Sequence, residues 1–280
     1  MIVYFNNDFK PIEEVSISPF DRGFLFADGV YESIRTYNKK LFMYEEHLKR
    51  LKRSLNEIRI EFKALNSIER IIYELVAKNN IKDEVLVYLQ ISRGTAIPRT
   101  HRFPEQKSEP TLFISANEFL ESREEQTNGV KVILQEDIRW LRCDIKSTSL
   151  LPVVLANQKA CEEGAVEAIL VRDGMITEGT HTSFFGVKNE TVYTAPKSRL
   201  IFDGITRGIV LDFCKKFKID VHEEYIKKDE LKDFSEFFIT STTKGITPVT
   251  EIDYWKINNG EPGKITKSLQ SVLKKITEDY

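Results

Sequence analysis

Cysteine is scarce in this chain and has no regular spacing. The three cysteines, Cys143, Cys161 and Cys214, form no C-x-x-C pair, so the sequence excludes a disulfide scaffold and a thiolate zinc site. The four histidines also lack the spacing of metal ligands, and we expect no bound metal. Neither a G-x-S-x-G motif nor a glycine-rich phosphate loop is present, which argues against a serine hydrolase and against a P-loop nucleotide site.

Long apolar runs and an excess of one charge are lacking as well. No stretch approaches the roughly 18 consecutive apolar residues of a membrane helix, and residues 1–10 contain no basic segment followed by an apolar one. We therefore expect neither membrane insertion nor a signal peptide. The 41 Lys and Arg residues nearly balance the 43 Asp and Glu residues, which gives no indication of a nucleic-acid partner. With 41% hydrophobic residues in 280, the composition predicts a cytoplasmic, mixed α/β protein of about two domains.

Hydrophobic periodicity predicts a small α/β domain over residues 1–117. Strands are predicted, from alternating or β-rich patterns, at residues 2–5, 30–37, 85–92 and 111–116. Apolar residues recur at spacings of three and four in 44–58, which predicts a helix that packs on a sheet. Residues 67–78 are predicted as a second helix with Ser67 at its N-cap.

A polar stretch at residues 118–129 is predicted as the linker to a larger domain, 130–280. Strands of this domain are predicted at residues 130–135, 167–172, 182–188, 191–195 and 236–240. Helices are predicted at 150–163, with Ser149 as its N-cap, and at 206–217. Because helices do not alternate strictly with strands, we expect mixed sheets, and a doubly wound sheet fits poorly.

Several segments carry polar residues that a fold alone does not require. His47 and Arg50 lie three positions apart on one helix face, where an arginine can bind a phosphate, although a solvated helix face explains the pair as well. Lys146 precedes a predicted helix. Lysine is the residue type that forms Schiff bases, but most lysines at such places are surface charges.

Other segments offer groups that suit anions. Residues 203–206 open a helix, whose first N–H groups face outward, and 240–243 end a strand in hydroxyl groups. Arg99 and His101, in a loop flanked by prolines, could bind a carboxylate. Taken singly, the first two features favour ordinary caps and turns, and the third is at least as well explained by an exposed basic loop. Glu178 is a single carboxylate with no assigned partner.

Together these segments resemble the fold-type IV aminotransferases that use pyridoxal phosphate (PLP). The resemblance rests on an ordered series of motifs, DRGFLFADGVYESIRTY, EEHLKRL, IRWLRCDIKS, EAILVRDGMITEG, GITR and FITSTTKGITPV. Within the family, RGTAIPRTHRFPE and EDIRWLRCDIKS are most similar to segments of D-amino acid aminotransferases. The resemblance implies a small N-terminal α/β domain and a larger C-terminal domain of mixed, barrel-like sheets and helices.

The resemblance also implies a role for each matching residue. Lys146 matches the lysine that binds PLP as a Schiff base and then moves the substrate proton. Glu178 matches the carboxylate that pairs with the pyridine nitrogen. The residues that match the phosphate site of PLP are Arg50, Ile205, Thr206, Ser241 and Thr242. Those that match the binding site of the substrate carboxylate are Tyr31, Arg99 and His101.

The implied activity is ping-pong transfer of the amino group of a D-amino acid, of the D-alanine or D-glutamate type, to a 2-oxo acid. The family implies a homodimer, in which the arginine and the histidine act from the other subunit. Branched-chain L-amino acid aminotransferase, aminodeoxychorismate lyase and a non-catalytic PLP-binding protein are alternatives. The sequence departs from the D-amino acid aminotransferase pattern at Ser33, Arg35, His181 and Phe202, which leaves the substrate preference open.

Overall fold

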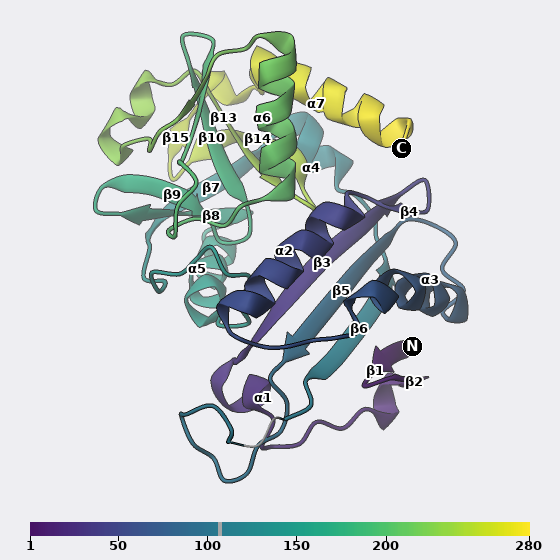
Figure 1. Ribbon diagram of the computed structural model, residues 1–280. Helices are drawn as coiled ribbons and strands as arrows, with labels where there is room; N and C mark the ends of the chain where they lie inside the picture. Colours follow the sequence, from purple (N-terminus) through teal and green to yellow (C-terminus); the bar gives the residue numbers. More distant parts are fainter. Residues whose placement is uncertain (106–107) are drawn as a thin grey trace. The chain divides into compact units, whose positions relative to one another are not determined.

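The computed structural model describes residues 1–105 and 108–280 and divides the chain into two compact units. Unit 1 contains Met1–Leu120, Ile145–Ser149 and Tyr280. Unit 2 contains Glu121–Asp144 and Leu150–Asp279. Figure 1 shows the elements in chain order, coloured from purple to yellow.

The predicted domain ranges differ from these units in the linker, which is divided between them, in residues 145–149 and in Tyr280. Residues 123–128, expected within a linker, form helix α4 (Arg123–Asn128). Segment 145–149 belongs to unit 1 because it runs along strand β3 (Gly29–Tyr37), where Thr148 N donates to the Gly29 oxygen over 3.0 Å. A boundary inferred from local composition cannot reveal such a pairing, because the partners lie far apart in the sequence.

The described strands of unit 1 form one antiparallel sheet with the order β2-β1-β6-β5-β3-β4. Its strands are β1 (Ile2–Phe5), β2 (Asp8–Pro11), β3, β4 (Lys40–Leu41), β5 (Val85–Ser92) and β6 (Thr111–Glu118). The helical segments of this unit are η1 (Ile12–Glu14), α1 (Arg22–Phe26), α2 (Tyr44–Glu57), η2 (Leu65–Ser67) and α3 (Ile68–Lys78). The predicted strands and the two predicted helices are confirmed. Helix α1 stands where the sequence indicated a turn, since five residues are too few to show helical periodicity.

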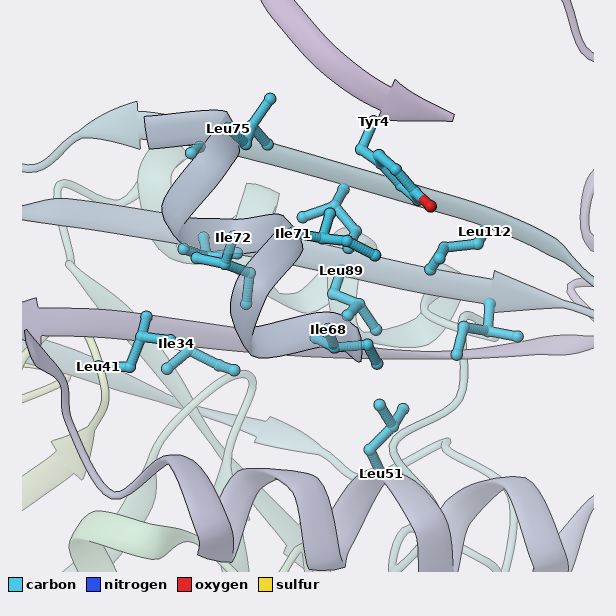
Figure 2. Packing of buried hydrophobic residues seen from close by; sticks show 14 of the residues in the cluster. Tyr4, Ile34, Leu41, Leu51, Ile68, Ile71, Ile72, Leu75, Leu89 and Leu112 are labelled. Atoms are coloured by element: carbon cyan, nitrogen blue, oxygen red, sulfur yellow. The ribbon is translucent and has the colours of Figure 1, made fainter. Parts of the chain in front are cut away.

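Helices α2 and α3 pack on the same face of this sheet. Figure 2 shows buried apolar side chains of both helices close to the strands, among them Leu51, Ile68, Ile71 and Ile72. The spacing of three and four positions in α3 places its apolar residues on one face. The side chain of Ile72 is fully buried, and removing such a side chain from water contributes about 1.5–3 kcal/mol.

Unit 2 contains a mixed sheet with the order β12-β11-β10-β13-β14-β7-β8-β9, in which β15 pairs with β14. Its strands are β7 (Val130–Glu136), β8 (Glu167–Arg172), β9 (Met175–Gly179), β10 (Ser183–Lys188), β11 (Thr191–Thr194), β12 (Val221–Glu223), β13 (Glu236–Ser241), β14 (Gly245–Ile252) and β15 (Trp255–Lys256). Its other helical segments are α5 (Leu151–Glu162), α6 (Ile205–Phe217), η3 (Lys228–Asp233), η4 (Asn258–Gly260) and α7 (Lys264–Glu278). The pairs β7/β8, β7/β14 and β11/β12 are parallel and the others antiparallel, which confirms the predicted mixed sheet.

Aromatic pairs join β10 to β13 in the core of unit 2. Phe185 and Phe238 face each other in register, with ring centroids 4.7 Å apart. Phe184 and Phe237 stack at 5.3 Å. Such pairs contribute about 0.5–1.5 kcal/mol beyond area burial. They fix two neighbouring strands whose adjacent ends carry hydroxyl side chains.

Of the two predicted N-caps, one is confirmed in position and the other was wrong. Ser67 is the N-cap residue of α3, but its hydroxyl donates to the Ala64 oxygen over 2.7 Å and makes no capping bond to the helix. Helix α5 has Leu150 at its N-cap. Ser149 does not cap it, because the helix begins at Leu151, one residue later than the pattern indicated, and Ser149 belongs to unit 1.

Candidate active site

The residues predicted to bind cofactor and substrate occur in both units. Unit 1 contains Tyr31, Arg50, Arg99, His101 and Lys146. Unit 2 contains Glu178, Ile205, Thr206, Ser241 and Thr242. The two sets differ in chemistry. Unit 1 supplies an amine, guanidinium groups, an imidazole and a phenol, whereas unit 2 supplies a carboxylate, hydroxyl groups and the first N–H groups of a helix.

Lys146 lies on the segment of unit 1 that pairs with β3. Tyr31 N donates to the Lys146 oxygen over 3.0 Å, and Lys146 N donates to Ser54 Oγ of α2 over 3.4 Å. These bonds hold the lysine backbone between a strand and a helix. Lys146 Nζ lies 4.2 Å from the centroid of the Tyr31 ring, within the range of a cation–π contact. The structure therefore brings the predicted reactive amine next to the predicted substrate-binding tyrosine.

Arg50 binds a carboxylate that sequence analysis did not assign. Its Nε and Nη2 donate to the two carboxylate oxygens of Glu32, each over 2.8 Å. His47 Nδ1 lies 2.8 Å from Glu32 Oε2, and all three side chains are buried. Alternation along β3 turns Glu32 toward α2, and the spacing of three positions turns His47 and Arg50 toward Glu32. The bidentate pair therefore fixes the orientation of the guanidinium group.

Burial and pairing set the charges of this triad. Burial alone would raise the pKa of Glu32, but Arg50 and His47 lower it to about 2. The carboxylate is therefore ionised at neutral pH. Burial lowers the pKa of His47 below its ordinary value even though Glu32 opposes the shift. A neutral His47 with its proton on Nδ1 donates to Glu32, so the triad contains one negative and one positive charge.

Arg99 and His101 contact one aromatic ring, that of Phe26 at the end of α1. Arg99 Cζ lies 4.6 Å from the centroid of this ring, and the His101 ring lies 5.5 Å from it. Both side chains are exposed. The two predicted carboxylate-binding residues of the loop thus contact the same side chain of α1. Tyr31, on β3, is instead bonded through its backbone to Lys146.

Glu178 of β9 accepts hydrogen bonds from one side chain and one backbone amide. Arg139 Nη1 donates to it over 2.5 Å, and Phe202 N lies 3.0 and 2.9 Å from its two oxygens. Arg139 also donates to both oxygens of Asp137, each over 2.9 Å. Arg172 pairs with Asp137 at 3.0 Å. Two buried carboxylates therefore share one guanidinium group, and a second guanidinium binds only one of them.

Glu178 is the group of this cluster that titrates near neutral pH. Burial raises the pKa of Glu178 from 4.5 to about 7, because Arg139 and the Phe202 amide offset only part of the desolvation. Burial also acts on Asp137, but Arg139 and Arg172 lower its pKa to about 2. The pKa of Arg139 is raised by its carboxylate partners, so its guanidinium group stays charged and the Glu178 carboxyl gains the proton.

The first turn of α6 and the end of β13 lie at one edge of the sheet of unit 2. Gly204 is the N-cap of α6 and, as a glycine, supplies no side chain to cap this turn. A Cβ atom on Gly204 would lie 2.8 Å from Ser183 Oγ, so the backbone passes close to the start of β10. Ser183 pairs in register with Thr240, and Ser241 follows Thr240 in β13. Helix N–H groups and hydroxyl groups are thus gathered at a positive helix end, which favours anions.

The remaining predicted residues of unit 2 connect to this edge through short segments. Phe202, which donates to Glu178, lies two positions before Gly204. Thr242 lies between Ser241 and Thr243, whose hydroxyl oxygens are 3.3 Å apart. The carboxylate, the first turn of α6 and the hydroxyl groups after β13 therefore belong to one contiguous region of unit 2.

Sequence reasoning missed the residues that hold the predicted ones. Glu32 interrupts the apolar face of β3, where Val30 and Ile34 are buried. A carboxylate on a core face requires a partner, and this signal could have linked it to α2. Arg139 lies in a motif that was recognised, but no local pattern connects it to Glu178.

Two positions that depart from the D-amino acid aminotransferase pattern make their own contacts. His181 Nδ1 lies 3.2 Å from an oxygen of the fully buried Glu167. The guanidinium carbon of Arg35 lies 4.0 Å from the ring centroid of Tyr37 and 4.6 Å from that of Phe119. Both side chains are therefore held by residues of their own unit.

The chain belongs to the class IV aminotransferase family, whose profile, described as amino-transferase class IV, matches residues 29–252. The resemblance inferred from the motifs is thereby confirmed. D-alanine aminotransferase of Bacillus licheniformis is 43% identical over 274 residues, which cover 98% of this chain and 96% of that protein. D-alanine aminotransferase of Staphylococcus aureus strain N315 is 38% identical over 281 residues, which cover 99% and 98%.

Two solved structures share the fold. The branched-chain amino acid aminotransferase of Escherichia coli superimposes with a TM-score of 0.91 at 22% identity, covering 99% of this chain and 95% of that one. The branched-chain aminotransferase of Thermoproteus uzoniensis, solved with norvaline, has a TM-score of 0.88 at 24% identity and covers 100% and 95%. The expected two-domain fold of type IV is therefore confirmed.

Proposed function

We propose that the protein transfers the amino group of a D-amino acid to a 2-oxo acid, with PLP as its cofactor. Relatives that are 36–43% identical over nearly their full length and are named D-alanine aminotransferases carry this proposal. The pair Arg99 and His101, called the carboxylate clamp below, supports it. Guanidinium and imidazole groups are donors suited to a carboxylate.

The side chains present fit the functional groups of PLP. Lys146 provides an amine for the aldehyde, and Glu178 provides a buried carboxylate for the ring nitrogen. The first turn of α6, whose N-cap Gly204 has no side chain and passes close to Ser183, suits the phosphate. Arg50 is proposed to bind the same phosphate. When bound, PLP supplies a ring that accepts electrons from the α-carbon of the substrate.

Lys146 is proposed to have two roles. Its Nζ would hold the aldehyde of the cofactor. As a free amine, the same group would be the base that takes the proton from the substrate α-carbon and the acid that gives it back. Its backbone bonds to Tyr31 and Ser54 limit where this amine can reach.

Glu178 is proposed to keep the ring nitrogen of the cofactor protonated. The carboxylate clamp is proposed to orient the substrate. An ionised Glu178 holds a proton on the ring nitrogen, which requires the carboxyl to release its own proton near neutral pH. Arg99, His101 and Tyr31 bind the substrate carboxylate. With the substrate nitrogen held at the cofactor, the position of the carboxylate decides whether the α-hydrogen or the side chain faces Lys146, so the clamp would select the D enantiomer.

The purified protein tests the activity directly. We expect transamination with D-alanine and 2-oxoglutarate, and little turnover of L-leucine or aminodeoxychorismate. Borohydride should fix a pyridoxyl group on the peptide that contains Lys146, detected by mass spectrometry, and Lys146→Ala should lack both the label and the activity. Preference for L-leucine would favour the branched-chain alternative, release of pyruvate from aminodeoxychorismate would favour the lyase, and label without turnover would favour a PLP-binding protein.

We also propose that the protein is a homodimer that acts in the cytoplasm. Exposed apolar side chains are frequent between residues 138 and 155, which supports a covered surface; they are Ile138, Trp140, Leu141, Leu151, Val154 and Leu155. Among residues 1–105 and 108–280, no helix combines the length and apolar character needed to cross a membrane. Sedimentation at equilibrium distinguishes the 32.5 kDa chain from twice that mass.

A further inference from the structure

We propose that helix α1 positions the carboxylate clamp and thereby contributes to the affinity for substrate. Arg22 binds the backbone of the loop that contains Arg99 and His101, called the clamp loop below. The ring of Phe26 contacts the side chains of both residues. This inference rests on the proposed function, in which the clamp binds the carboxylate. Arg22 and Phe26 are positioning residues, because they act through the clamp.

The backbone on both sides of His101 is held by one guanidinium nitrogen. Arg22 Nη1 donates to the Thr100 oxygen over 2.8 Å and lies 3.3 Å from the Arg102 oxygen. The Arg22 side chain is buried, whereas the clamp side chains are exposed. A buried cation shared by two carbonyl groups fixes an otherwise exposed loop, since charge-assisted hydrogen bonds are stronger than neutral ones.

Arg22 is itself anchored to the body of unit 1. Its Nε donates to Asp28 Oδ2 over 2.8 Å, and Arg93 donates to both oxygens of Asp28 over 2.7 and 2.9 Å. Burial alone would raise the pKa of Asp28, but Arg93 and Arg22 lower it, so the carboxylate remains charged. Arg93 also donates to the backbone oxygens of Ile58 and Arg59. The clamp loop is therefore connected through three charged side chains to the end of α2.

The Phe26 ring is contacted by three side chains. Arg22 Cζ lies 4.7 Å from its centroid, Arg99 Cζ lies 4.6 Å from it, and the His101 ring lies 5.5 Å away with an interplanar angle of 53°. A ring that carries both clamp side chains holds them near each other before substrate arrives. Because less side-chain freedom is then lost on binding, the clamp is preorganised and its affinity for a carboxylate rises.

The consequence is a separation of binding from chemistry. Loss of the ring or of Arg22 leaves Lys146 and Glu178 untouched, so turnover at saturating substrate should persist. The KM values for D-alanine and for 2-oxoglutarate should rise together, since the clamp binds the carboxylate of both. A merely structural role for α1 predicts lower stability with unchanged KM.

Variants of one helix test this separation. We expect Phe26→Leu to raise both KM values about 3- to 10-fold, the size of a lost cation–π contact, with kcat within about twofold of wild type. Phe26→Tyr, which keeps the ring, should restore the wild-type KM. Phe24→Leu is the matched control, because Phe24 lies in the same helix and is 74% exposed, and its KM should equal that of the wild type.

Arg22→Met removes the second positioning side chain. Arg99→Ala removes a residue of the clamp itself and so tests the clamp separately from its positioning by α1. We expect Arg22→Met to raise KM at least about tenfold. The absorption spectrum of its bound cofactor should match that of the wild type, which shows that the cofactor site is intact. If Arg99→Ala leaves KM unchanged, the clamp itself is misassigned and the proposed substrate binding fails with it. If Arg99→Ala raises KM but Phe26→Leu does not, or Phe26→Leu lowers kcat at constant KM, the role of α1 is overturned and the clamp stands.

Discussion

The buried carboxyl of Glu178 should make the stability of unit 2 depend on pH near neutrality. Burial raises its pKa from 4.5 to about 7, so the folded protein binds this proton more tightly than the unfolded chain does. The resulting stabilisation is fully present below pH 4.5 and is lost as the pH rises through about 7. At about 1.4 kcal/mol per pKa unit, the loss amounts to about 3 kcal/mol.

Glu178→Gln isolates this contribution, because the amide has nearly the same shape and cannot ionise. We expect the free energy of unfolding of the variant, relative to wild type, to increase by about 3 kcal/mol between about pH 4.5 and about pH 8. The pH-dependent change is the test, since glutamine also weakens the bond to Arg139 at every pH. Urea unfolding of the cofactor-free protein, followed by tryptophan fluorescence, reports on unit 2, which contains both Trp140 and Trp255.

Glu32→Gln is a control with the opposite shift. Arg50 and His47 lower the pKa of Glu32 to about 2 despite burial, so its stabilisation is present above pH 4.5 and disappears only as the pH falls toward 2. Its effect, followed by circular dichroism, should therefore be constant from about pH 6 to about pH 8. If the effect of Glu178→Gln is equally constant, the ion pair with Arg139 outweighs burial and the reasoning is refuted.

Two further predictions concern the other charged and close-packed positions. Glu32→Gln should lower the free energy of unfolding by about 3–5 kcal/mol at neutral pH, because it leaves the buried Arg50 without a countercharge; a loss below about 1 kcal/mol would mean that the triad is solvated. Gly204→Ala should weaken PLP binding about tenfold, the size of an anion interaction with a helix end, since the new Cβ atom would lie 2.8 Å from Ser183 Oγ. Gly208→Ala is the control, because it lies in the same helix with no atom within 4 Å of the added Cβ. It should bind PLP as the wild type does in a fluorescence titration. Equal weakening in both variants would show that the close approach of Gly204 to Ser183 does not matter for PLP binding.

Local patterns predicted about half of the described elements of the fold; β14 and α4, for example, were not predicted. Helix α2 shows a clear apolar stripe, and β5 matches residues 85–92 because turn residues bound its apolar run. Helix α1 was missed, because its five residues are held by contacts that no periodicity reveals. Its N-cap Asp21, for example, accepts a hydrogen bond from Ser92 far along the chain.

Only those residues of the candidate site that lie in recognised motifs could be predicted from the sequence. Lys146, Glu178 and Arg50 were assigned from the ordered motifs, and their roles stay predictions. Their partners were not found, because pairs such as Glu178 with Arg139 join positions that only the folded chain brings together. The charge states of the buried carboxyl groups could not be predicted either. The pKa of a carboxyl depends on its burial, which the sequence does not show for individual residues.

The excursion of residues 145–149 into unit 1 has a consequence for biosynthesis. The ribosome completes all six strands of the sheet of unit 1 and their covering helices before it translates the stretch that carries the lysine. Residues 145–149 can therefore join unit 1 only after residues 121–144 of unit 2 have been translated, although domains generally fold as units in order of synthesis. A gene fragment that stops after codon 120 would encode the clamp and Arg50 without the reactive amine, so the enzyme cannot be divided at that boundary into a self-sufficient half.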